Sequence, residues 1–150
     1  MTFEIVVRGT PRAQPRARAR VVTPRNGRPF AAFYTPASAD AFRDELVLRA
    51  RAHAEFPRVP WAGPVRRDVD AYVERPKRLC RASDPPGPIP HGVKPDRDNV
   101  EKAIMDALTV AGLWRDDCQV CAGEVRKWYA AKGCDAGTVV RAEEVSPCSC

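Results

Sequence analysis

The segment KPDRDNVEKAIMDALTVAGLWRDDCQV, residues 94–120, has the clearest pattern in the chain. From residue 98 to residue 111 its apolar residues recur at helical spacing, while Asp98, Lys102 and Asp106 follow one another every four residues on the other side. Gly112 comes directly afterwards, and glycine adopts the left-handed conformation that commonly ends a helix. The segment therefore predicts a helix with one face in a hydrophobic core and a charged face outside.

Four aspartates flank this predicted helix, Asp96 and Asp98 at its start and Asp116 and Asp117 in the turn after it. Helix capping explains an acid at a helix start, and a polar turn explains the other pair. Four carboxylates in one place repel one another, however, unless a cation or basic groups compensate. Carboxylate oxygens suit Mg²⁺ or Mn²⁺, which also bind water and phosphate oxygens. Taken together, the four aspartates favour metal-assisted hydrolysis of a phosphodiester.

Lys102 lies one turn beyond Asp98 on the same predicted helix face. It either forms an ordinary ion pair at this spacing or stabilises charge on a scissile phosphate. The chain has only two histidines, and neither a phosphate-binding G-x-x-x-x-G-K-[ST] loop nor an H-E-x-x-H motif occurs. Histidine-based nucleases and nucleotide hydrolases are therefore disfavoured, and we expect no nucleotide cofactor.

The basic residues are concentrated in the first part of the chain. Residues 1–95 contain 18 basic and 9 acidic residues, whereas residues 96–150 contain 7 and 10. Seven arginines occur from Arg8 to Arg28, and no acid occurs between Glu4 and Asp40. Such a stretch favours binding to nucleic-acid phosphates, with a solvated basic loop as the alternative. The candidate DNA contacts are Arg12, Arg16, Arg18, Arg20 and Lys94.

The remaining patterns predict one α+β domain over residues 1–150. We expect strands at 2–8, 65–74, 119–129 and 137–145, and a first helix that begins at Thr35-Pro36 and ends near Phe56. A basic loop, residues 9–34, follows the first strand, and a loop with six prolines, residues 76–95, precedes the second helix. The order is βαβαββ, which predicts a mixed four-stranded sheet with two helices.

Composition and cysteine content limit the class of protein. Hydrophobic residues make up 44% and charged residues 29%, which is ordinary for a globular chain. No apolar run is long enough to cross a bilayer and no secretory signal is evident, so we expect a cytoplasmic protein without a membrane partner. The six cysteines are then expected to be reduced. A zinc site built from Cys118, Cys121, Cys148 and Cys150 is the alternative.

The motifs together resemble those of the RusA family of Holliday-junction resolvases. The resemblance is dense over residues 94–127, and the strand and basic loop at the start of the chain also resemble those of phage-borne members. The proline-rich loop is longer than expected, and the cysteine-rich C-terminus has no counterpart. The residues that carry the resemblance are Lys94-Pro95-Asp96-Arg97-Asp98-Asn99, Lys102, Asp106-Ala107-Leu108, Ala111-Gly112-Leu113-Trp114 and Asp116-Asp117-Cys118-Gln119-Val120.

The resemblance implies a Mg²⁺-dependent endonuclease that acts as a homodimer and cuts four-way DNA junctions by paired nicks in recombination and repair. By position, Asp96, Asp98 and Asp117 would be the catalytic metal ligands and Lys102 the essential lysine. Lys127 would be a further phosphate contact. The roles of Asp116 and Asp106 stay open. Two alternatives also remain: a nuclease that prefers flaps or forks, and a zinc-stabilised DNA-binding module without enzyme activity.

Overall fold

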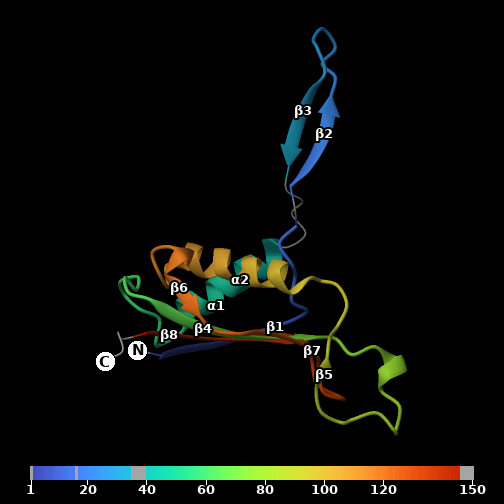
Figure 1. The fold of residues 1–150 in the computed structure, drawn as a ribbon, viewed down its shortest axis with the longest axis vertical. Helices are drawn as coiled ribbons and strands as arrows, with labels where there is room; N and C mark the ends of the chain where they lie inside the picture. The colour runs from blue at the N-terminus through green and yellow to red at the C-terminus, as the bar shows by residue number, and fades with distance from the viewer. Residues whose placement is uncertain (1, 16, 35–39, 146–150) are drawn as a thin grey trace.

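A mixed sheet and two helices that cover one of its faces form the body of the protein, and a separate β-hairpin projects from it (Figure 1). The computed structural model describes residues 2–15, 17–34 and 40–145. The sheet has the strand order β1-β8-β4-β7-β5, with β6 paired to one end of β4. Its strands are β1 (Thr2–Arg8), β4 (Val65–Val73), β5 (Ile89–Pro90), β6 (Val120–Ala122), β7 (Val125–Tyr129) and β8 (Gly137–Glu144).

The predicted α+β class with two helices is confirmed, but the sheet has six strands rather than four. Strand β8 lies antiparallel to both β1 and β4, whereas β6 and β7 both run parallel to β4. A parallel pair needs a long crossover between its strands, and here the crossover includes the second helix. Between β4 and β6 the chain thus adds only the short edge strand β5 to the sheet and then passes through the helix.

The two helices are α1 (Asp40–Ala52) and α2 (Arg97–Ala111). Helix α2 ends as predicted, because Gly112 has a left-handed φ of 87° and its N–H donates to the carbonyls of Leu108 and Thr109. Helix α1 ends before the predicted Phe56, and its predicted start at Thr35-Pro36 lies outside the described residues. None of the described helices is long and apolar enough to span a membrane.

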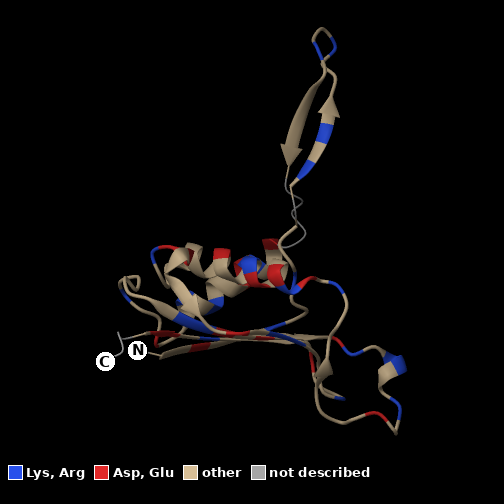
Figure 2. Ribbon diagram, viewed as in Figure 1, with Lys and Arg blue, Asp and Glu red and all other residues tan. Residues whose placement is uncertain are grey.

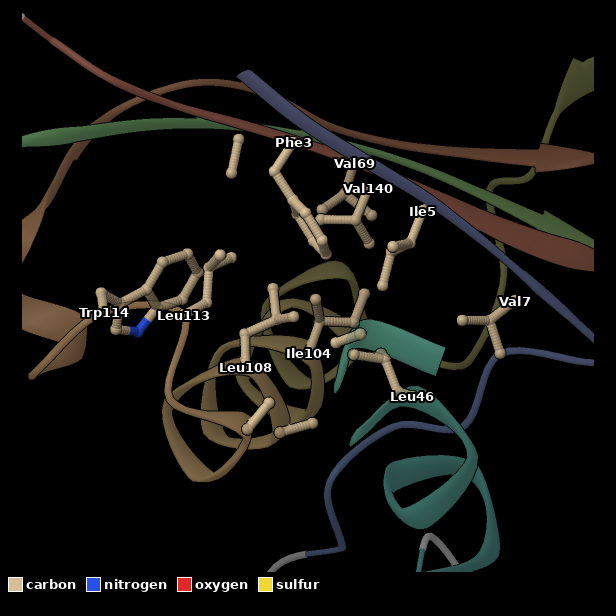
Figure 3. Close-up of a cluster of buried hydrophobic side chains, with 14 of the residues drawn as sticks. Phe3, Ile5, Val7, Leu46, Val69, Ile104, Leu108, Leu113, Trp114 and Val140 are labelled. Carbon is tan, nitrogen blue, oxygen red and sulfur yellow. The ribbon is translucent and has the colours of Figure 1, made fainter. Parts of the chain in front are cut away.

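The core lies between the sheet and the helices. Phe3, Ile5 and Val7 alternate with exposed residues along β1 and are at most 3% exposed. They point toward buried side chains of both helices, including Leu46 of α1 and Ile104 of α2 (Figure 3). Because burial of a large apolar side chain stabilises a fold by about 1.5–3 kcal/mol, this contact fixes α2 on the sheet.

The basic segment 9–34 is not only a loop, as predicted, but contains a β-hairpin. Strands β2 (Arg18–Val22) and β3 (Phe30–Tyr34) pair antiparallel, and the turn between them includes Asn26-Gly27. We call this hairpin, residues 18–34, the arm. Its charge pattern obscured the strand signal, which comes from β-branched and aromatic residues in both strands, such as Val21 and Phe33. The arm projects away from the helices and the sheet (Figure 1).

The predicted strand at 119–129 is interrupted. A short 3-10 helix, η3 (Asp117–Gln119), precedes β6, and Gly123 separates β6 from β7. Gly123 has a φ of 128°, and a Cβ atom there would lie 1.7 Å from the Arg67 carbonyl oxygen. Only glycine permits this close approach to β4, so two short strands replace one long strand.

The proline-rich segment 76–95 is mostly irregular, as predicted, but it includes a second 3-10 helix, η2 (Lys77–Leu79), and strand β5. Its carbonyl groups are bound by two cationic side chains. The Arg75 guanidinium donates to Leu79 and Gly87, and the Lys132 ammonium donates to Arg81 and Asp84. These bonds hold the loop beside the sheet.

Candidate active site

Asp96 and Asp98 lie at the N-terminal end of α2, and both side chains are exposed. Asp96 occupies the cap position, where its carbonyl accepts the N–H of Val100 at 3.1 Å, but its carboxylate makes no capping bond. That carboxylate has one long hydrogen bond, 3.5 Å from Asn99 Nδ2. The Asp98 carboxylate has neither a hydrogen bond nor an ion pair within the described residues. Capping by these side chains therefore does not explain the two acids.

Lys127 of β7 holds the turn that leads into Asp96. Its Nζ atom donates to the carbonyls of Val93 at 2.7 Å and Pro95 at 2.5 Å. The N–H of His91 in turn donates to the Lys127 carbonyl at 3.0 Å. Two of the three N–H donors of the ammonium group are thus used inside the protein. The position of Asp96 depends on this link to the sheet, while the predicted phosphate contact of Lys127 stays a prediction.

Lys102 is exposed on α2 and forms an ion pair, but its partner is Asp106 rather than Asp98. The Nζ–Oδ1 distance is 3.4 Å, and the Lys102 side chain is 59% exposed. An exposed pair at this spacing contributes about 0.3–0.5 kcal/mol, so it holds the ammonium group only weakly. Lys102 thus stays accessible to a ligand that approaches the same end of α2.

Asp116 and Asp117 differ in their surroundings, which sequence did not predict. The Asp116 carboxylate accepts the backbone N–H of Cys118 at 2.9 Å and caps η3. Hydrogen bonds from Cys118 hold the pKa of Asp116 below its ordinary value. Asp117 is exposed in the first position of η3. Asp116 therefore shapes the turn and Asp117 presents its carboxylate to solvent.

Gln119 is a positioning residue that the sequence interpretation missed. Its Oε1 accepts the N–H groups of Arg115 and Asp116, and its Nε2 donates to the carbonyls of Trp61 and Gly63. The signal was present, because an acid followed three residues later by glutamine is a capping-box pattern. Gln119 thereby fixes η3, and with it Asp117, to the loop before β4.

The two ends of α2 carry separate groups of acids. The 15-residue helix is about 22 Å long at about 1.5 Å per residue, with Asp96 and Asp98 at its start and Asp117 beyond its end. Strand β6 directly follows η3 in the chain. Figure 1 shows β6 near the C-terminal end of α2, whereas the proline-rich loop enters α2 at its N-terminal end. In the described part of the chain, no three histidine, cysteine or acidic side chains gather to hold a metal ion. A single chain therefore brings together Asp96, Asp98 and the helix face with Lys102, but not Asp117.

The donor set at the start of α2 fits a hard divalent cation. Asp96 and Asp98 offer exposed carboxylate oxygens without strong partners, and Mg²⁺ commonly takes only one or two carboxylates from a protein. The remaining coordination positions are usually filled by water and phosphate oxygens. This end of α2 can therefore contribute two carboxylates to a metal site, and Asp117 of the same chain does not join them.

Basic residues lie beside this end of the helix. The N–H of Gln14 donates to the Asn99 carbonyl at 2.9 Å, which places the segment leading into the arm against the first turn of α2. Arg12 is exposed in that segment, and Lys94 is exposed two residues before Asp96. Arg18 and Arg20 lie on the arm (Figure 2), whereas Arg16 falls outside the described residues.

An ion pair between a buried arginine and a partly exposed glutamate orients α2 on the sheet. Arg67 of β4 is 3% exposed and pairs with Glu101, which lies one turn after the start of α2. Arg67 falls at an inward position between Val65 and Val69, so its burial could have been predicted from the alternation. Loss of Glu101 would leave the buried Arg67 guanidinium without its acidic partner, so the pair ties the direction of α2 to β4.

Two of the four cysteines of the alternative zinc site lie in the described part of the chain. Cys118 and Cys121 are exposed and free, and a hydrogen bond with Asp116 raises the pKa of the Cys118 thiol. Zinc binds the thiolate, so this bond opposes metal binding at Cys118. The other two residues of the predicted zinc site, Cys148 and Cys150, lie outside the described residues.

Exposed carboxylates beside accessible basic side chains are groups that metal-assisted hydrolysis of a phosphodiester can use. Residues 8–141 match the family described as endodeoxyribonuclease RusA. The chain belongs to this family.

Relatives in this family have names that state their activity. Proteins named crossover junction endodeoxyribonuclease RusA from Escherichia coli (strain K12) and Shigella sonnei (strain Ss046) are each 47% identical to this chain over 45 residues. A relative with the same name from Enterobacteria phage 82 has the same identity over the same length. Each match covers 30% of this chain and only 38% of the relative.

Proposed function

We propose that this protein is a metal-dependent endonuclease that resolves four-way DNA junctions. The observation that carries the proposal is the pair of exposed carboxylates, Asp96 and Asp98, at the start of α2. They lie beside the segment that leads into the basic arm. Membership of the RusA family and the names of the relatives support the junction as the substrate.

The residues at the start of α2 suit phosphodiester hydrolysis. Asp96 and Asp98 would hold Mg²⁺, and Mn²⁺ prefers similar ligands. When bound, such a cation supplies an activated water and offsets negative charge on the phosphate. Lys102 offers its ammonium group to the scissile phosphate, since its pair with Asp106 is weak. Arg12, Arg18, Arg20 and Lys94 bind neighbouring phosphates and hold the DNA.

A second copy of the chain would supply the missing carboxylate. Asp117 is separated from Asp96 and Asp98 by the length of α2, so Asp117 from one copy must meet the start of α2 in the other. A two-fold axis creates two equal sites of this kind. The homodimer thus accounts both for a complete metal site and for the paired nicks that resolution of a junction requires.

Cleavage of synthetic DNA tests the proposed function. The substrates are a labelled four-way junction, a replication fork, a flap and a linear duplex, each incubated with purified protein with Mg²⁺, with Mn²⁺ and with EDTA. We expect symmetrical nicks in the junction with either cation and no cleavage in EDTA. Preferential cleavage of the fork or flap would contradict the junction as substrate. Stoichiometric zinc without metal-dependent cleavage would support the zinc-stabilised DNA-binding module instead.

A further inference from the structure

The two faces of the arm have different chemistry. Paired residues in an antiparallel hairpin share a face, and successive pairs alternate between faces. The register pairs Ala19 with Phe33 and Val21 with Ala31, so these four residues form one face, which we call the apolar face. The opposite face, which we call the basic face, consists of Arg18, Arg20, Val22, Phe30, Ala32 and Tyr34.

The apolar face is uncovered in the described part of the chain. Val21 and Phe33 are each 74% exposed, and Ala19 and Ala31 are exposed as well. The arm forms its own two-stranded sheet and pairs with none of the six strands of the body. A two-stranded hairpin is marginally stable on its own, so a partner that covers this face would also order the arm. Exposed apolar surface of this kind commonly marks an interaction site.

The charges around this face indicate which partner covers it. Arg18 and Arg20 lie on the basic face, where the Arg20 guanidinium is 5.8 Å from the centre of the Tyr34 ring. Arg25 and Arg28 lie in and beside the turn at the tip. The arm has no acidic residue, and a second copy of this chain has a net charge of +6. A partner that combines dense negative charge with flat apolar surface fits better, and nucleic acid has both properties.

The required apolar surface of DNA is available only where base stacking is broken. Inside a duplex the faces of the bases are covered by their neighbours, whereas a branch point leaves the terminal base pairs of its arms free to unstack. Apolar side chains that insert at such steps are a known mode of DNA binding. Phe33 pairs with Ala19, at the end of the hairpin nearer the body, and the segment leading into the arm contacts the first turn of α2.

We infer that the apolar face of the arm binds unstacked base pairs at a DNA branch point, with Phe33 and Val21 against the bases. The inference rests on the proposed function and adds to it the element that distinguishes a junction from duplex DNA. The basic face and the tip hold the flanking phosphates, which are present in both kinds of DNA. Loss of Phe33 should therefore affect branched DNA selectively.

Binding measured in EDTA separates these contributions. The variant Phe33→Ala removes the aromatic ring from an exposed position, and Leu48→Ala, at a 66% exposed site on α1, is the matched control. We expect Phe33→Ala to weaken binding to a four-way junction about tenfold, within the range for loss of one base–aromatic stack, and to change binding to a linear duplex less than about twofold. Leu48→Ala should change neither.

A fluorescent base reports contact directly. With 2-aminopurine at the branch point, the wild-type protein should change the fluorescence and Phe33→Ala should not. Equal weakening of junction and duplex binding, or no change in either, would overturn the inference. So would a shift of Phe33→Ala from dimer to monomer in sedimentation without DNA, because a second copy would then cover the face. If the wild type cleaves the junction in Mg²⁺ while these results occur, the proposed function stands and only this inference fails.

Discussion

Helix α2 and the arm carry the two halves of the proposed activity, and they differ in almost every physical respect. The helix is packed on the sheet by side chains that are fully buried, such as Ile104 and Leu108, and it presents a few charges at defined positions. The arm has almost no buried residue and presents its arginines and aromatic rings to solvent. Rigid placement suits residues that must hold a metal ion, whereas an exposed hairpin suits contact with a large and variable DNA surface.

The largest expected effect concerns the start of the helix. Asp98→Asn keeps the size of the side chain but removes an anionic ligand, so junction cleavage in Mg²⁺ should fall by several orders of magnitude. Binding in EDTA should be unchanged or tighter, because a carboxylate repels phosphate when no cation lies between them. The control is Asp44→Asn, the same change at an exposed position of α1. Near-normal cleavage by Asp98→Asn would show that this residue is not a metal ligand.

The second largest expected difference is in the free energy of unfolding, which should depend on α2 far more than on the arm. Leu108 is fully buried, so Leu108→Ala should lower the free energy of unfolding by about 2–5 kcal/mol. Phe33→Ala should change it by less than about 0.5 kcal/mol, since most of the ring already contacts water. Urea unfolding of both variants measures the difference. A large loss for Phe33→Ala would mean that the arm packs on protein in solution.

Lys127 links the sheet to the helix start, and its replacement should have an intermediate effect. Lys127→Met removes the donors to Val93 and Pro95, so cleavage should fall about 10–100-fold, as for other residues that orient metal ligands. The salt dependence of DNA binding distinguishes this role from a phosphate contact. A positioning role leaves the slope of log K against log salt unchanged, whereas a lost phosphate contact reduces it by about 0.9. Lys77→Met, at an exposed site in the proline-rich loop, is the control.

The smallest expected effect concerns the basic face of the arm. Replacing Arg18 and Arg20 together by Ala should reduce the same slope by up to about 2 units for duplex and junction alike, since phosphate contacts carry no information on branching. Arg43 and Arg49 of α1 are the matched pair, because each already has an acidic partner on its own helix. An unchanged slope for the arm variant would mean that these arginines do not contact DNA.

The sequence predicted the helical region better than the arm, for a physical reason. The spacing of buried residues in α2 and the glycine after it are local signals, and both proved correct. In the arm, arginines at alternate positions concealed the pairing of Val21 with Ala31, so the segment was interpreted as a loop. The break at Gly123 could not be predicted either, because it arises from contact with the distant Arg67 carbonyl.

The candidate site shows the same division between local and long-range information. The sequence identified Asp96, Asp98 and Lys102 as neighbours, because a single helix sets their positions relative to one another. It also grouped Asp117 with them, although the length of α2 separates them within one chain. Residues that lie close in the sequence can be far apart in space when a helix separates them, as α2 separates Asp98 from Asp117. The different roles of Asp116 and Asp117 became visible only with the hydrogen bonds of Cys118 and Gln119.

The central claim is that carboxylates at the two ends of α2 act on DNA together, across two subunits. Mixing two inactive variants, Asp98→Asn and Asp117→Asn, tests it most directly. After subunits exchange in an equal mixture, half of the dimers contain one copy of each variant, and each such dimer has one complete site. We predict that each variant alone is inactive and that the mixture regains roughly a quarter of the wild-type nicking rate in Mg²⁺. A mixture in which subunits have exchanged but which stays inactive would contradict the shared site, and normal cleavage by either variant alone would contradict the site itself.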